Sequence, residues 1–171
     1  MQMVKKILLL LLAGYLAFMI FMPKTELYYM LEKELAKSEI TLNEKSIDEG
    51  WFSLHVKEIT LYAKGVKIAT IEELNYFTLF FYNSAELLML EVDDLLKSKV
   101  PAKTTELMLR QHLFSPLTVA IDANGTFGVI EGAFQLSDNV LRLNFVEEKE
   151  INMILPLLKK DEKGRYYEKS F

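Results

Sequence analysis

The sequence predicts a mainly β protein, in which an N-terminal transmembrane helix and a short amphipathic helix precede a curved antiparallel β-meander. Three observations lead to this prediction. An uncharged apolar run comes first, apolar residues then recur at helical spacing, and from Ile40 onward apolar and polar residues alternate with a period of two. We therefore divide the chain into an anchor (1–23), a linking amphipathic helix (24–39) and an antiparallel β domain (40–171).

The anchor is predicted from residues 7–22, which carry no charge. A membrane-spanning helix needs roughly 20 apolar residues, and the apolar residues that precede the first lysine pair extend the run toward that length. Lys5, Lys6 and Lys24 flank the anchor. Because basic residues stay on the cytoplasmic side, Lys5 and Lys6 predict a cytoplasmic N-terminus and an exported domain.

A cleaved secretory signal is the alternative interpretation of this segment. Cleavage requires small residues at positions −3 and −1. Residues 18–22 offer no small side chain, and Tyr15 stands two positions before Ala17. We therefore favour an uncleaved anchor.

The linking helix is predicted over residues 26–37, with Thr25 as its N-cap. Its apolar residues fall on one stripe at helical spacing, and charged residues cover the other faces. The stripe consists of Leu27, Met30, Leu31 and Leu35.

The β domain is predicted to contain roughly eight strands. Residues 50–56 alternate, and a bulge at 57–58 would bring the apolar residues that follow onto the same face. Residues 74–82 are apolar on both faces, which is typical of a central or lipid-facing strand. Residues 85–96 fit a helix or a strand, and their neighbours favour a strand.

Turn residues delimit the second half of the domain. Asn124 and Gly125 predict a hairpin. Residues 147–160 suggest a short helix interrupted by Pro156, and residues 165–171 a last strand. Connections this short exclude parallel crossovers, so the sheet should be an antiparallel meander. Such a sheet can close on itself, form a sandwich, or curl into a groove with one apolar concave face, and the strand spacing suits all three.

Composition argues against most catalytic and cofactor chemistry. The chain has 171 residues, no Cys, two His and a net charge of −4. We therefore expect no thiol catalysis, no metal site, no cofactor and no nucleic-acid partner. The one catalytic alternative that we keep open is a convergence of Asp93, His112 and Arg110. We predict that the protein is not an enzyme.

The aromatic and aliphatic content is the remaining unusual feature, with 11 Phe, 8 Tyr and 8 Met. An ordinary core would account for it, and so would a groove that receives acyl chains or a partner strand. The candidate groove residues are Phe77, Leu79, Phe81, Val119, Ile121, Phe127 and Phe134.

Two stretches resemble a known family. Residues 50–61 resemble the G-x-x-L-x-L-x-D-V-x-L strand of AsmA-like proteins and of type II secretion system protein N. Residues 116–132 are similar to the later P-x-x-V-x-x-x-G-x-x-G-x-x-x-G hairpin of the same group. Together the stretches cover about thirty residues.

The resemblance implies a bent β-groove in the periplasm, held by one helix in the inner membrane. It implies a non-enzymatic accessory or scaffold of an envelope complex of the type II secretion kind. The alternative is a lipid-binding or lipid-transfer module of the AsmA-like or LptC-like kind. The expected partners are the inner membrane, an envelope or secretion complex, and acyl chains in the alternative case.

Overall fold

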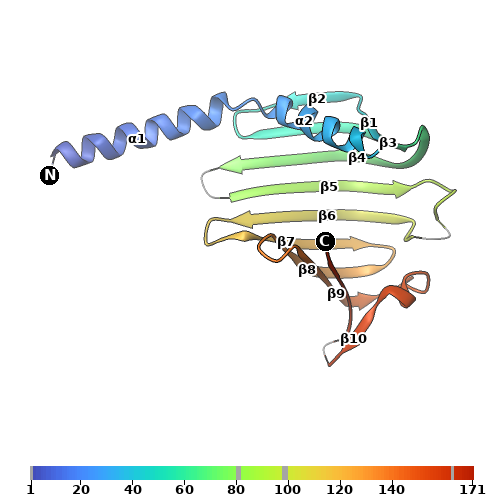
Figure 1. Ribbon diagram of the computed structural model, residues 1–171. Coiled ribbons are helices and arrows are strands. Elements are labelled where there is room, and N and C mark those ends of the chain that lie inside the picture. Colours follow the sequence, from blue (N-terminus) through green and yellow to red (C-terminus); the bar gives the residue numbers. More distant parts are fainter. Residues whose placement is uncertain (1, 80–81, 98–99, 163) are drawn as a thin grey trace.

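The computed structural model describes the chain except for residues 1, 80–81, 98–99 and 163. Helices α1 (Gln2–Phe21) and α2 (Lys24–Lys37) come first, and a single antiparallel sheet of eleven strands follows (Figure 1). A short 3-10 helix, η1 (Leu155–Leu157), lies near the C-terminus. The strands are β1 (Ile40–Asn43), β2 (Ser46–Glu49), β3 (Ser53–Ala63), β4 (Val66–Leu79), β5 (Tyr82–Val92), β6 (Lys103–His112), β7 (Ser115–Gly125), β8 (Gly128–Gln135), β9 (Val140–Glu148), β10 (Lys159–Asp161) and β11 (Gly164–Ser170).

The sheet is a meander, as the short connections predict. Its order is β1-β3-β4-β5-β6-β7-β8-β9-β11-β10, with β2 also paired to β3, and every described pair is antiparallel. The segment that fits a helix or a strand is a strand, β5. The expectation of about eight strands was too low because the short strands β1, β2 and β10 lie at the edges, where four or three residues leave little pattern to detect.

Two local predictions near the C-terminus have different outcomes. The last strand is confirmed as β11. The short helix predicted over residues 147–160 is wrong apart from the three residues of η1. β9 continues to Glu148, and Pro156 lies within the single turn of η1, because proline fits the first turn of a helix but not its interior.

The predicted irregularity at residues 57–58 does keep the apolar residues on one face. Val56 and Ile59 are both buried, although a three-residue step in a regular strand would put them on opposite faces. Glu58 lies between them in the left-handed region, with φ of 51°. The pairing register with β4 is the same on both sides of Glu58, so this is not the inserted-residue bulge that we expected. The same three-residue step recurs in the paired residues of the next two strands, Ile71 and Leu74 in β4 and Leu87 and Leu90 in β5.

The hairpin predicted at Asn124 and Gly125 joins β7 to β8 and is confirmed. The turn closes between Gly125 and Gly128, which are directly paired. Gly128 has φ of 100°, and a Cβ built there would lie 1.9 Å from the carbonyl oxygen of Glu147 on β9. Glycine is therefore required at this position both for its backbone conformation and for the close approach of the neighbouring strand.

Helix α2 begins two residues earlier than predicted, and Thr25 is not its N-cap. Pro23 occupies the cap position and offers no side-chain acceptor. The carboxylate of Glu49, at the end of β2, takes that role instead. It accepts hydrogen bonds from the backbone N–H of Lys24 at 3.1 Å, from the N–H of Thr25 at 3.2 Å and from the Thr25 hydroxyl at 2.5 Å. A carboxylate at this position also interacts favourably with the helix dipole.

Helix α1 stands apart from the sheet. Its 20 residues are as long and as apolar as a membrane span, and none of them is buried in the protein. Length and composition are also those of a signal sequence. Among the described residues, α1 is the one helix with these properties.

Candidate apolar binding groove

One face of the sheet is apolar across almost its whole width. The register connects residues of successive strands into rows that run perpendicular to the strands. Two neighbouring rows contain only apolar residues and glycine from β3 to β9. One row is Leu54, Tyr76, Ala85, Leu109, Ile121, Gly132 and Leu143, and the other is Val56, Leu74, Leu87, Leu107, Ala123, Ile130 and Phe145.

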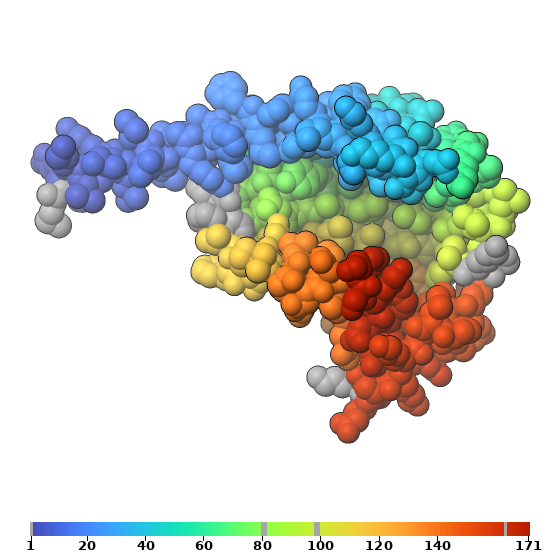
Figure 2. Space-filling view, viewed as in Figure 1, coloured from blue at the N-terminus to red at the C-terminus, as the bar shows by residue number. Residues whose placement is uncertain are grey.

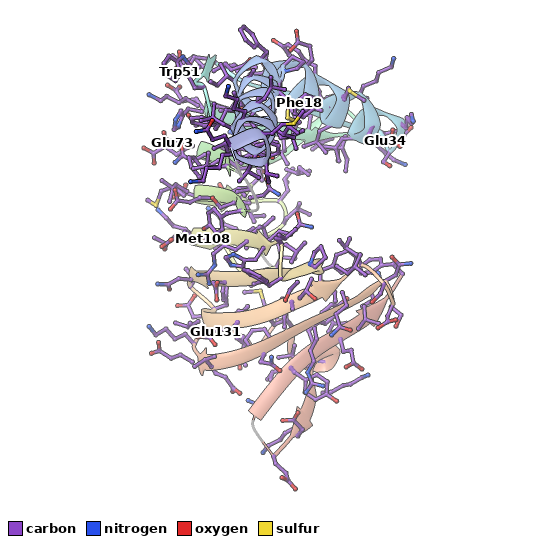
Figure 3. All side chains as sticks on the ribbon, turned by 90° about the vertical axis from the view of Figure 1, so that its left-hand side faces the viewer. Phe18, Glu34, Trp51, Glu73, Met108 and Glu131 are labelled. Carbon is purple, nitrogen blue, oxygen red and sulfur yellow. The ribbon has the colours of Figure 1, made fainter. Side chains whose placement is uncertain are left out.

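The opposite face of the sheet is polar. The row that lies between the two apolar rows, with its side chains on the other face, is His55, Asn75, Glu86, Met108, Asp122, Glu131 and Asn144. Figure 3 shows Glu73, Met108 and Glu131 on the side of the sheet away from α2. Since neighbouring residues of a strand point to opposite faces, this contrast defines an apolar inner face and a polar outer face.

Two short segments cover the inner face at its two sides, one over the first strands of the sheet and one over the last. At the first side, Tyr28 of α2 packs on Leu54, Val56, Ile59 and Ile71. At the other side the chain after β9 folds back over the sheet. Its residues Ile151, Ile154, Leu155 and Leu158 pack on Phe127, Ile130 and Phe145.

The middle of the inner face lies between these two covers. Leu107, Leu109 and Ile121 on β6 and β7 are half-buried and belong to neither cluster of the described residues. Figure 2 shows the surface hollowed between α2 and the C-terminal third of the chain, with β4 to β6 at the bottom of the hollow. We call Leu107, Leu109 and Ile121 the open floor. The inner face is therefore a groove with two apolar walls, not the closed core of a sandwich.

A cavity of about 260 Å³ extends the groove under α2. Leu27, Tyr28 and Leu31 of α2 line it from above, and Leu74, Tyr76 and Ala85 of the sheet line it from below. Burial raises the pKa of the Tyr28 hydroxyl far above its usual range, and the nearby carboxylates of Glu44 and Glu32 add to this effect. Burial thus disfavours the ionised form of Tyr28 further, as expected for a side chain that lines an apolar wall.

Lys24 also reaches this cavity, although the sequence suggests a lysine that flanks the membrane. Lys24 is 1% exposed to solvent. The ammonium donates a hydrogen bond to the carbonyl oxygen of Met22 at 3.1 Å and lies 3.6 Å from the Glu49 carboxylate. Lys24 therefore connects the start of α2 to β2 and is turned away from solvent. Lys5 and Lys6 lie on exposed positions of α1.

A polar row bounds the groove on the side of α1. Thr78, Asn83 and Gln111 are paired across β4, β5 and β6 and share the inner face. The Thr78 hydroxyl donates to the Asn83 side-chain oxygen at 2.6 Å, and the Asn83 amide donates to the Gln111 oxygen at 3.4 Å. The inner face is therefore apolar along its middle and hydrogen-bonding at this end.

The residues that the sequence suggested for a groove are divided between the two faces. Val119, Ile121 and Phe134 lie on the inner face. Val119 is paired with Gln111 and with Phe134, and Ile121 is paired with Leu109. Phe127 is buried beneath the C-terminal segment and serves the core.

Phe77 and Leu79 alternate with Tyr76 and Thr78 and thus lie on the outer face, so they do not line the groove. The apolar character of residues 74–82 on both faces did not reveal which face is inward. Phe81 lies outside the described residues.

Most of the groove was missed by the sequence analysis. Leu107 and Leu109 alternate with Glu106, Met108 and Arg110, but many ordinary core strands show a similar alternation. One signal could have revealed the inner face. The three-residue step between apolar residues occurs at paired positions of β3, β4 and β5, and it shows that these residues form one continuous apolar surface.

The structure does not bring the catalytic candidates together. Asp93 follows the end of β5, whereas His112 is paired with Tyr82 at the start of β5. Arg110 forms an ion pair with Asp122 on the outer face. The Nδ1–H of His55 donates a hydrogen bond to the side-chain oxygen of Asn75 at 2.6 Å within the outer polar row. Among the described residues, no group of three His, Cys, Asp or Glu is placed to hold a metal ion.

Fold and face together define a class: an open, curved antiparallel sheet with a half-covered apolar inner face, joined to a helix long enough to span a membrane. No protein-family model matches the chain, and no curated protein and no solved structure is significantly similar to it. Arguments about function therefore depend on the geometry of this groove.

Proposed function

We propose that this protein is a membrane-anchored, non-enzymatic binding module whose groove receives an apolar ligand, with the acyl chain of a lipid as the occupant. The observation that carries the proposal is the open floor between two apolar walls. An exposed apolar strip of this kind is unfavourable in water unless a ligand or partner covers it.

The dimensions and polarity of the groove fit a lipid. On the inner face of β7, Val119, Ile121 and Ala123 are apolar over four residue steps, about 13 Å at roughly 3.3 Å per residue. One acyl chain spans about half of a hydrocarbon core of roughly 30 Å, which is close to the length of this apolar stretch. The polar row of Thr78, Asn83 and Gln111 offers hydrogen bonds to the polar end of such a molecule.

Strand addition to the sheet is less well supported. β1 and β2 form one edge and have four residues each, and β10 at the other edge has three. Edges this short offer few backbone groups to an incoming strand. An occupant of the inner face is therefore favoured over an occupant of the edge.

Crosslinking from a photoreactive amino acid at position 109, carried out in living cells, tests the proposal. Leu109 points into the groove, and its neighbour Met108, equally half-buried, points to the outer face. We expect irradiation to attach a lipid at position 109 and not at position 108. Absence of a lipid adduct from position 109 would contradict the proposal.

The second candidate is an accessory or scaffold role in an envelope complex, as the resemblance to type II secretion system protein N implies. The same groove would then hold an apolar segment of a partner protein. A defined protein adduct at position 109, in place of a lipid adduct, would favour this candidate.

Placement in the cell is part of the proposal. We propose that α1 remains in the inner membrane as a single span, with Lys5 and Lys6 in the cytoplasm and residues 24–171 in the periplasm. The apolarity of α1 and the position of its two lysines support this orientation.

A further inference from the structure

The turns of the meander fall alternately at two ends of the sheet. The turns at 50–52 and 113–114 lie at the end next to α1, and the turns at 64–65 and 93–97 lie at the far end (Figure 1). Glu49 binds the first two backbone N–H groups of α2, so the end of α1 is held beside the β2–β3 turn. A membrane spanned by α1 would therefore meet the first pair of turns.

Large exposed apolar side chains are concentrated at the end next to α1. Trp51 in the β2–β3 turn is 72% exposed, and Phe114 in the β6–β7 turn is 97% exposed. Leu113 and Leu117 beside Phe114 are exposed as well. Side chains of this size at turn tips add nothing to the core, and their exposure is unfavourable in water.

The far end has a different composition. Its turns carry the exposed charged residues Lys64, Asp94 and Lys97. Lys64 pairs with Glu39, and Lys97 pairs with Asp94. The exposed apolar residues at this end are Leu95, with 70% exposure, Val66 with 51% and Val100 with 38%, and none of them is aromatic. The two ends of one sheet thus differ in the way that a membrane-facing and a water-facing surface differ.

From this arrangement we propose that the β2–β3 and β6–β7 turns insert Trp51, Leu113 and Phe114 into the interfacial layer of the membrane that α1 spans. The occupant of this surface is the lipid bilayer itself. Tryptophan and other aromatic side chains prefer the headgroup level, where an apolar ring with a polar edge is well accommodated. The proposal depends on the proposed anchor role of α1, and it places the polar end of the groove against the bilayer.

Phe77, Tyr82 and His112 extend this surface on the outer face. The ring centroids of Phe77 and Tyr82 are 6.3 Å apart, and those of Tyr82 and His112 are 5.0 Å apart. These residues occupy the strand ends beside the same turns. The position of Phe77, which does not line the groove, thereby has an explanation.

Trp51 is the only tryptophan in the chain, so its fluorescence reports directly on this surface. The experiment uses the full-length protein in vesicles of zwitterionic lipid, prepared with and without bromine atoms on the acyl chains near the headgroups. We expect emission shifted to shorter wavelength, strong quenching by the brominated lipid and protection from iodide in the aqueous phase.

Two matched variants move the tryptophan. Trp51→Phe combined with Phe114→Trp keeps it at the α1 end and should retain quenching by brominated lipid. Trp51→Phe combined with Leu95→Trp moves it to the far end and should abolish that quenching while leaving iodide quenching strong. Circular dichroism confirms that each variant retains its β structure.

The outcomes separate this inference from the anchor proposal. Protein that floats with the vesicles but whose tryptophan at position 51 or 114 is quenched by iodide and not by bromine overturns the inference and leaves the anchor intact. Equal bromine quenching at positions 51 and 95 also overturns it. Protein that does not float with the vesicles overturns both proposals.

Discussion

Glu49 shows how one side chain organises the junction between the two helices and the sheet. Its carboxylate caps α2 and forms an ion pair with the side chain of Lys24 in the first turn of that helix. The Thr25 hydroxyl, together with the backbone N–H groups of Lys24 and Thr25, lowers the pKa of the Glu49 carboxyl below its usual value. The junction is therefore sensitive to the protonation of this one group.

Glu49→Gln should destabilise the protein by about 1 kcal/mol at neutral pH, the usual contribution of a helix cap. A carboxyl whose pKa is lowered by folding stabilises the protein above its unfolded pKa of about 4.3, and the contribution is lost as pH falls through the lowered value. The difference between wild type and variant should therefore shrink below about pH 4. Chemical unfolding of the full chain in detergent, followed by circular dichroism, measures it.

Glu34→Gln is the control for this change. Glu34 lies on α2 and pairs with Lys37, but both side chains are well exposed. Its replacement should change the free energy of unfolding by less than about 0.5 kcal/mol. A Glu49→Gln effect that stays constant from neutral to acid pH would contradict the role assigned to the charge.

At the scale of single elements, the segment between β9 and β10 has little regular structure, yet it makes a large contribution to packing. It contains only one short 3-10 turn, yet Ile151 is 3% exposed and packs in the core with Phe127, Ile130 and Phe145. The segment forms one wall of the groove. Its contribution to stability comes from side-chain burial and not from backbone regularity.

Ile151→Ala should lower the free energy of unfolding by about 2–5 kcal/mol, as expected when a buried aliphatic side chain is truncated. Met153→Ala in the same segment should change it by less than about 0.5 kcal/mol, because Met153 is well exposed. Denaturant unfolding of both variants provides the comparison. Equal effects at the two positions would show that the segment does not pack on the sheet in solution.

At the scale of the whole molecule, the decisive property is the orientation of the sheet relative to the membrane. The chain contains no Cys, so single cysteines can be introduced without background labelling. In spheroplasts, an impermeant maleimide should label Asp94→Cys, which is exposed at the end of the sheet far from α1, and should not label Gln2→Cys at the start of α1. Labelling of the second variant in intact spheroplasts would overturn the proposed topology.

Sequence reasoning was most successful where a pattern repeats. Alternation over short stretches such as residues 50–56 predicted parts of the long strands, and the short turns between them predicted an antiparallel meander. It failed at Thr25, since the capping group Glu49 is 24 residues further along the chain. It failed at the three- and four-residue edge strands because these are too short for a period to be seen.

The groove was only partly predictable for a related reason. Periodicity indicates that Ile121 and Phe77 each share a face with their second neighbours, but it does not say which face is inward. That choice depends on the cross-strand register, which sets Ile121 beside Leu109 and Phe77 beside Ser84.

The sequence by itself determined the division into an apolar helix and a β-meander, since local hydrophobic periodicity is a property of neighbouring residues. Only the tertiary structure decided that the sheet stays open between α2 and the C-terminal segment. The two covers come from opposite ends of the chain, and the width of floor they leave exposed follows from packing over long separations that no local pattern contains.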